Sequence, residues 1–227
     1  MKIEYKMAPS ILAADFSKLG EEIGRLDDNN ADYVHIDVMD GAFVPNISIG
    51  IPVVRSLRKC TELFFDVHLM VNEPIRYIEK FAEAGADGIT VHAEACEDLS
   101  ATLDKIIEMG KKPAVSISPD TDIDVILPYL DKVNMVLLMS VYPGYGGQKL
   151  IERTLDKAKA LRKYISENGL DIDIEMDGGI KIENVKKVVE AGVNVVVAGT
   201  GVFRGDMAEN MKGFRDVFAE VENNDKS

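Results

Sequence analysis

Short runs of apolar and β-branched residues alternate with longer amphipathic segments along the whole chain. The short runs predict β-strands, because buried strands are typically about four to eight residues long. We place the strands at Ala8–Leu12, Tyr33–Val38, Leu63–Leu69, Gly88–His92, Pro113–Ile117, Met135–Val141, Asp173–Met176 and Val195–Ala198.

The longer segments repeat their apolar residues at helical spacing and predict α-helices. Several of them end on a Gly or Asn that can close a helix, and a strand then follows. Because the same signal recurs, one supersecondary unit is repeated. The predicted helices cover Ser17–Asp28, Pro52–Arg58, Ile75–Ala84, Leu99–Met109, Ile123–Leu130, Thr154–Asn168 and Ile182–Ala191.

This alternation predicts an α/β fold, a (β/α)8 TIM barrel. The 227 residues leave roughly 28 for each of eight units, at the compact end for this fold. A doubly wound open sheet is the alternative, but it usually has fewer strands and a Gly-rich first turn, which Ser10–Ala14 is not. We expect a single barrel domain over residues 1–221 and a disordered tail over 222–227.

Charge and cysteine content narrow the class of protein. The chain has 26 Lys and Arg against 39 Asp and Glu, a net charge of −13, which disfavours nucleic acids and anionic membranes as partners. Two cysteines are too few for a disulfide framework. The first ten residues lack a signal-peptide pattern, and no apolar run approaches the roughly 18 residues of a membrane span. We therefore expect a cytoplasmic protein.

Polar residues interrupt three of the predicted strands near their carboxyl ends, where barrel enzymes place their active sites. Residues two apart along a strand share one face. This spacing groups His35 with Asp37 and Met39, Asp66 with His68 and Met70, and Glu175 with Asp177.

If these faces point inward, two imidazoles and two carboxylates meet at the barrel mouth. Such a set suits one divalent metal ion, for which Zn, Fe, Mn and Co are candidates. The alternative is that each residue is a hydrogen-bonded polar group of the core, which is less favoured when all four occupy matching strand ends. The four residues are His35, Asp37, His68 and Asp177.

Two further features at strand ends leave alternatives open. His92 ends the fourth predicted strand, with Glu94 two residues later, and could be a ligand, a substrate contact or a hydrogen-bonding support. Met39, Met70 and Met139 end three strands, either as ordinary core residues or as apolar walls that exclude water from a planar intermediate.

Glycines gather in the loops after the last three predicted strands. Glycine lets backbone N–H groups approach an anion closely, and the loops after strands seven and eight commonly hold phosphate in this fold. The sequence therefore predicts a phosphate site. The glycines are Gly144, Gly146, Gly147, Gly178, Gly179, Gly199 and Gly201.

A metal, two carboxylates and a phosphate site favour proton transfer at a carbon beside the carbonyl of a sugar phosphate. Asp37 and Asp177 come from the second and seventh strands, so they can act on opposite faces and invert a stereocentre. A Schiff-base mechanism is disfavoured, because Lys149 and Lys181 lie in loops.

Four stretches resemble the motifs of the ribulose-phosphate 3-epimerase family: HIDVMDGAFVPN from His35, DVHLMV from Asp66, YPGYGGQ from Tyr142 and EMDGG from Glu175. The resemblance runs from Pro9 to the loop after the last strand. It implies an enzyme that interconverts D-ribulose 5-phosphate and D-xylulose 5-phosphate through a 2,3-enediolate.

The resemblance also implies roles for individual residues. The four residues of the metal set would bind the ion, with Asp37 as proton acceptor and Asp177 as proton donor. Ser10 and His68 would contact the sugar. The substrate, mainly its phosphate, would be held by Gly144, Tyr145, Gly146, Gly147, Gly178, Gly179, Gly199 and Thr200.

The sequence departs from the family pattern near the phosphate loops. Tyr142 stands where Asn is usual, Tyr145 where Phe is usual, and Leu150 where an aromatic is usual. Asp120 stands in a Ser-Pro-Asp-Thr turn that differs from the usual one, and Thr200 replaces the commoner Ser. These departures leave allulose 6-phosphate as an alternative substrate, and a non-catalytic sugar-phosphate-binding barrel as a less favoured function. We expect a homo-oligomer.

Overall fold

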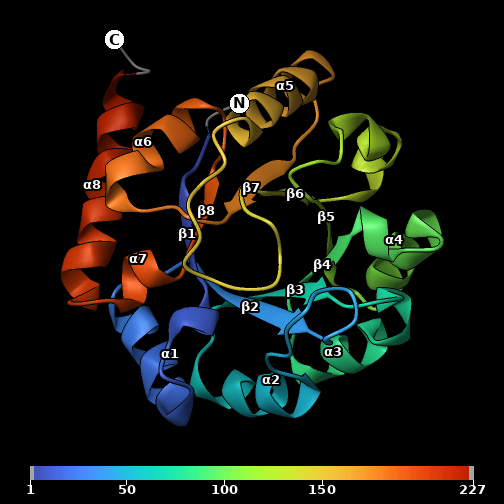
Figure 1. Cartoon of the computed structure of the whole chain (residues 1–227), viewed down its shortest axis with the longest axis horizontal. Helices are drawn as coiled ribbons and strands as arrows, with labels where there is room; N and C mark the ends of the chain where they lie inside the picture. The colour runs from blue at the N-terminus through green and yellow to red at the C-terminus, as the bar shows by residue number, and fades with distance from the viewer. Residues whose placement is uncertain (1–2, 225–227) are drawn as a thin grey trace.

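The computed structural model describes residues 3–224. Eight parallel strands pair in the order β1-β8-β7-β6-β5-β4-β3-β2, and a parallel bridge between Ser10 and His35 joins the first strand to the second (Figure 1). The fold is a TIM barrel, as the alternation of strands and helices predicted. The strands are β1 Lys6–Pro9, β2 Tyr33–Met39, β3 Phe64–Met70, β4 Gly88–His92, β5 Lys112–Ile117, β6 Met135–Met139, β7 Asp173–Asp177 and β8 Val195–Ala198.

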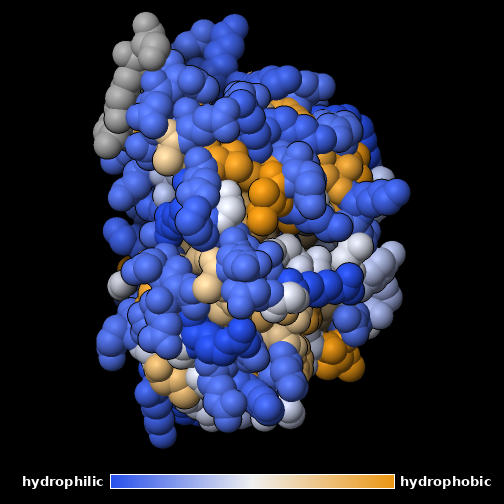
Figure 2. All heavy atoms as spheres, turned by 90° about the vertical axis from the view of Figure 1, so that its left-hand side faces the viewer, coloured by the Kyte–Doolittle hydropathy of each residue, from blue (hydrophilic) through white to orange (hydrophobic). Residues whose placement is uncertain are grey.

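Helices surround the strands in a ring (Figure 1). Figure 2 shows the face that carries α6, α7 and α8, on which hydrophilic residues predominate and apolar residues are visible in patches between them. No helix within residues 3–224 combines the length and the apolar character that a membrane span requires. The helices are α1 Leu19–Asp28, α2 Ile51–Leu57, α3 Ile78–Ala84, α4 Leu99–Glu108, α5 Thr154–Glu167, α6 Ile182–Glu190, α7 Thr200–Phe203 and α8 Met207–Asn224.

Several predicted elements have other bounds in the structure: the helices predicted from Ser17 and Ile75 begin at Leu19 and Ile78, and the strand predicted to Val141 ends at Met139. Two larger differences have a clear cause. The first strand ends at Pro9 rather than Leu12, because the Ser10 hydroxyl accepts a hydrogen bond from the Leu12 N–H and caps a 3-10 turn. The helix predicted over Ile123–Leu130 is instead two 3-10 segments. Pro128 has no N–H and cannot continue an α-helical hydrogen-bond pattern there.

The end of the chain also differs from the prediction. Residues 222–224, predicted to begin a disordered tail, continue α8 to Asn224, and 225–227 lie outside the described residues. This helix is anchored because Phe218 and Val221 are buried, and the Phe218 ring stacks on Tyr5 at 5.4 Å between centroids.

Alternate residues of each strand face opposite sides of the barrel wall. Val34, Ile36 and Val38 of β2 belong to the apolar core between strands and helices. His35 and Asp37, which lie between them, therefore point into the barrel, where both are buried. The alternation in β3 is the same. The inward direction predicted for the polar residues is confirmed.

Candidate active site

Four inward-facing residues from three strands converge at the barrel mouth. One ligand atom of each lies within 4.8 Å of the others. The Oδ1 atom of Asp37 is 3.3 Å from His35 Nε2 and 3.1 Å from His68 Nδ1. Atoms that bind one metal tetrahedrally at about 2.0–2.1 Å are roughly 3.3 Å apart. His35, Asp37, His68 and Asp177 are therefore compatible with a metal site.

The donor atoms themselves favour a cation. His35 Nε2 is buried and makes no hydrogen bond to any described residue. A buried polar atom without a partner typically costs about 1–3 kcal/mol, which a bound metal would remove. His35 Nδ1 is 2.6 Å from Asp66 Oδ2, so Nε2 is the ring nitrogen on the Asp37 side, 3.3 Å from Asp37 Oδ1. Burial lowers the pKa of His35, but the Asp37 and Asp66 carboxylates outweigh it and raise that pKa well above its usual value.

A second acidic group lies deeper in the barrel and fits a metal less well. His35, Asp66 and Glu175 also bring ligand atoms together. Burial, and then the Asp66 carboxylate, raises the pKa of Glu175 well above its usual value. Asp66 and Glu175 do not line the mouth cavity, whereas Asp37 and Asp177 of the first set do. The shallower set is the better candidate.

The two aspartates of that set differ in protonation. Burial raises the pKa of Asp37, but the adjacent His35 and then His68 outweigh it and lower that pKa well below its usual range. The Ser10 hydroxyl also donates to Asp37 Oδ2, at 2.5 Å. Burial, and then the Asp37 carboxylate, raises the pKa of Asp177 to about 7. The pKa values of these two neighbouring carboxyl groups are thus shifted in opposite directions, which is typical of acid–base pairs.

A cavity of about 340 Å³ opens above this set, at the carboxyl ends of the strands. Its walls include most of the residues that the sequence predicted for the site. Ser10, His35 and His68, which are buried, do not line it, and neither does Gly201, which was predicted for the phosphate site. The predicted residues that line it are Asp37, Met39, Met70, Met139, Gly144, Tyr145, Gly146, Gly147, Asp177, Gly178, Gly179, Gly199 and Thr200.

Sequence reasoning missed several lining residues, among them Leu12, Ala13, Val197 and Arg204. Arg204 follows α7 and is the one cationic side chain among the described residues of the lining. A cation shortly after the strand-eight glycines could have indicated it, because that loop commonly holds phosphate in this fold.

Two segments distant in sequence meet over the mouth. The Asn46 side chain donates from Nδ2 to the carbonyl oxygen of Gly144 at 2.9 Å. Asn46 belongs to the segment between β2 and α2, and Gly144 to the segment between β6 and α5, which crosses in front of the barrel in Figure 1 (yellow). The glycine-containing loop is therefore held against a second loop.

The glycines at the end of β7 are required by close packing. Gly178 and Gly179 have φ of +126° and +67°, in the region that favours glycine. A Cβ on Gly179 would lie 2.3 Å from Leu150 N and 2.7 Å from Gln148 O. The β7 loop and the β6–α5 segment therefore approach each other more closely than any side chain would permit.

Two of the departures from the family pattern are linked. The Tyr142 hydroxyl donates to Asp120 Oδ2 at 3.0 Å, and Arg153 pairs with the other carboxylate oxygen of Asp120. This cluster joins the loop after β5 to the loop after β6, at the rim of the cavity. The Tyr142 and Tyr145 side chains remain largely exposed.

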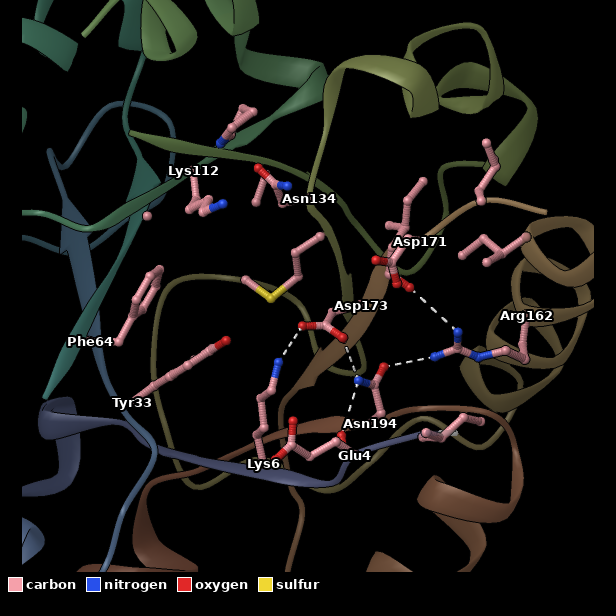
Figure 3. Close-up of a pocket in the computed structure, with 18 of the residues that line it drawn as sticks. Glu4, Lys6, Tyr33, Phe64, Lys112, Asn134, Arg162, Asp171, Asp173 and Asn194 are labelled. Carbon is pink, nitrogen blue, oxygen red and sulfur yellow. Dashed lines mark hydrogen bonds and ion pairs between the residues drawn. The ribbon is translucent and has the colours of Figure 1, made fainter. Parts of the chain in front are cut away.

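A larger cavity, of about 640 Å³, lies at the amino-terminal end of the barrel (Figure 3). Its polar groups bind one another: Lys6 pairs with Asp173 at 2.7 Å, and Asn194 bridges Asp173 to Arg162. Active sites of this fold lie at the opposite end of the barrel, at the carboxyl ends of the strands. The smaller cavity is therefore the candidate active site.

Comparison with known proteins agrees with this geometry. The sequence matches the Ribulose-phosphate 3 epimerase family over residues 6–203. The chain belongs to this family. It is 49% identical over 213 residues to ribulose-phosphate 3-epimerase of Synechocystis, covering 92% of this chain and 93% of that protein. It is 50% identical over 199 residues to ribulose-phosphate 3-epimerase of Bacillus subtilis, covering 87% of this chain and 92% of that protein.

Solved structures with much lower identity share the fold. The structure of 3-keto-L-gulonate-6-phosphate decarboxylase from Vibrio cholerae superposes with a TM-score of 0.69 at 16% identity, over 96% of this chain and 99% of that one. The structure of 3-hexulose-6-phosphate synthase from Salmonella typhimurium superposes with a TM-score of 0.65 at 19% identity, over 95% of this chain and 99% of that one. The family motifs, rather than the fold, indicate the activity.

Proposed function

We propose that this chain is a metal-dependent ribulose-phosphate 3-epimerase that interconverts D-ribulose 5-phosphate and D-xylulose 5-phosphate. The observation that carries the proposal is that Asp37 and Asp177 line one cavity together with three glycine-containing loops. The pKa values of the two aspartates are shifted in opposite directions there. The chain belongs to the ribulose-phosphate 3-epimerase family, which supports the choice of reaction.

The chemistry assigned to the chain is a proton transfer at carbon 3 of the substrate. Asp37, which is ionised, accepts the proton from one face of that carbon and leaves a 2,3-enediolate. Asp177, which holds a proton near neutral pH, donates to the opposite face, and the configuration inverts. In the reverse reaction the two residues exchange roles. The Ser10 hydroxyl holds the Asp37 carboxylate in place through a hydrogen bond.

The metal would be held by His35, Asp37, His68 and Asp177, and when bound it would stabilise the negative charge that develops on the substrate oxygens. Zn, Fe, Mn and Co remain candidates, since all accept mixed imidazole and carboxylate ligands.

The rest of the cavity is assigned to substrate recognition. Backbone N–H groups of Gly144, Gly146, Gly147, Gly178, Gly179, Gly199 and Thr200, with the Tyr145 segment, would hold the phosphate. Met39 and Met70 pack together in the cavity lining, and Met139 lies beside Asp177 in the sheet register. These three apolar side chains would flank the enediolate and exclude water from it.

The direct experiment follows hydrogen at carbon 3. Purified protein with ribulose 5-phosphate in D₂O should produce xylulose 5-phosphate that carries deuterium at carbon 3. Product that retains its original hydrogen would contradict the mechanism. Binding without exchange would indicate a non-catalytic barrel. The same assay with allulose 6-phosphate tests the six-carbon alternative, which a higher kcat/KM for that substrate would support.

Two further parts of the proposal concern the protein's surroundings. We infer a cytoplasmic location, supported by Cys60 and Cys96, which form no disulfide, and by a phosphorylated substrate. We also infer a homo-oligomer, which light scattering of the purified protein would test.

A further inference from the structure

His92 is a buried imidazole that the proposed mechanism does not use. It ends β4 with no exposed surface. Its Nε2 lies 2.9 Å from His68 Nε2, and its Nδ1 lies 3.3 Å from Glu94 Oε2. His92 therefore connects a proposed metal ligand to a carboxylate outside the metal set.

A hydrogen bond between two imidazole nitrogens requires one N–H and one lone pair. With both rings neutral, two arrangements satisfy the contact. In the forward arrangement His68 donates from Nε2, its Nδ1 keeps a lone pair, and His92 is protonated on Nδ1. In the reversed arrangement His92 donates from Nε2, His68 is protonated on Nδ1, and the lone pair of His92 lies on Nδ1. Only the forward arrangement leaves His68 Nδ1 able to bind a metal.

The two ends of this chain of contacts favour opposite arrangements. Asp37 Oδ1 is 3.1 Å from His68 Nδ1 and, in the absence of a cation, attracts a proton to that nitrogen. At the other end, a Glu94 carboxylate can only accept a hydrogen bond. It binds the Nδ1–H of His92 in the forward arrangement and faces a lone pair in the reversed one, which is repulsive.

Glu94 is held in position by contacts of its own. Its Oε1 atom accepts a hydrogen bond from the Ser118 backbone N–H at 2.7 Å and another from the Thr121 hydroxyl. Both donors lie in the loop after β5, which Lys157 ties together by donating to the carbonyl oxygens of Ser118, Pro119 and Thr121. The Oε2 atom is left to face His92.

We propose that Glu94, acting through His92, is a positioning residue that keeps the Nδ1 lone pair of His68 directed at the metal site. The inference rests on the proposed metal site and adds two residues to it. Outer hydrogen-bond partners of metal-bound histidines typically contribute about 10–100-fold to metal affinity. Here the partner is a second imidazole backed by a carboxylate.

Glu94→Gln is the sharpest variant. The Ser118 N–H still needs an acceptor, so the amide oxygen stays there and the amide NH₂ faces His92 Nδ1. That donor favours the reversed arrangement while it preserves the shape of the side chain. We expect the affinity for Zn²⁺, measured by competition with a chromophoric chelator, to fall about 10–100-fold. The control is Glu97→Gln, which removes the same charge from an exposed residue of the same loop. It should change the Zn²⁺ affinity by less than about twofold.

A second measurement separates positioning from structural support. In ¹⁵N NMR spectra of the metal-free wild-type protein, His68 should be protonated mainly on Nε2, and in Glu94→Gln mainly on Nδ1. Unchanged Zn²⁺ affinity in Glu94→Gln, or a wild-type His68 protonated on Nδ1, would overturn the inference. If the variant does not fold, the wild-type spectrum alone decides. Wild-type protein that binds no divalent cation would contradict the proposed metal dependence instead, while the spectrum still tests the role of Glu94.

Discussion

Gly179→Ala tests the close approach of the two loops that form the predicted phosphate site. The new Cβ would lie 2.3, 2.7 and 2.8 Å from backbone atoms of residues 148–150, whereas ordinary contacts begin near 3.4 Å. The main chain of one loop must therefore move by roughly 1 Å, because no flexible side chain can yield, and overpacking of this kind costs about 1–3 kcal/mol. The φ of +67° adds about 1–2 kcal/mol for a residue with a Cβ.

The expected total loss of unfolding free energy is about 2–5 kcal/mol. Urea denaturation followed by circular dichroism measures it, with Gly146→Ala as the matched control, because a Cβ there has no heavy atom within 4 Å. The control should stay within about 0.5 kcal/mol of wild type. In Gly179→Ala, the KM for ribulose 5-phosphate should also rise, because the displaced loop belongs to the proposed phosphate site. A Gly179→Ala protein as stable as the control would refute the reasoning.

Three further predictions concern the site. Asp66→Asn removes the carboxylate on His35 Nδ1 and should weaken Zn²⁺ binding about 10–100-fold in the chelator competition; wild-type affinity would show that Asp66 does not orient the ring. Arg204→Ala should raise KM about tenfold with kcat nearly unchanged, because a cation in the lining contributes to binding in ground and transition states alike, and an unaltered KM would exclude a phosphate contact. Removal of the metal by chelation should abolish turnover, and adding the metal back should restore it; full turnover of metal-free protein would contradict the metal dependence. The affinity for the metal should fall as the pH falls, because protons compete with the metal for the imidazoles.

The barrel and the metal set could be predicted because both follow from regular spacing in the sequence: the alternation of strands and helices for the barrel, and the two-residue period within each strand for the metal set. Spacing by two residues places His35 and Asp37 on one face, and burial of Val34 and Ile36 on the other face determines which side is inward. Local exceptions were harder. Ser10 ends β1 early by capping a turn, and Pro128 divides a segment whose apolar spacing is helical.

Contacts between side chains of different loops could not be predicted, because they depend on rotamers and loop paths. The bond from Asn46 to Gly144 joins residues 98 apart in sequence. Sequence spacing pairs His92 with Glu94, yet nothing in the sequence places His92 Nε2 at 2.9 Å from His68. The link between Tyr142 and Asp120 is similar: both departures are visible in the sequence, but their contact is not.

The most direct test of two-sided proton transfer is hydrogen exchange by Asp37→Asn and Asp177→Asn, each checked for retained fold and metal content. Each variant keeps one aspartate and should wash the carbon 3 hydrogen of one epimer into D₂O without forming the other epimer. Asp177→Asn should exchange the epimer whose carbon 3 hydrogen faces Asp37, and Asp37→Asn should exchange the opposite one. Both variants exchanging the same epimer, or either one still interconverting the two, would contradict the assignment of the aspartates to opposite faces.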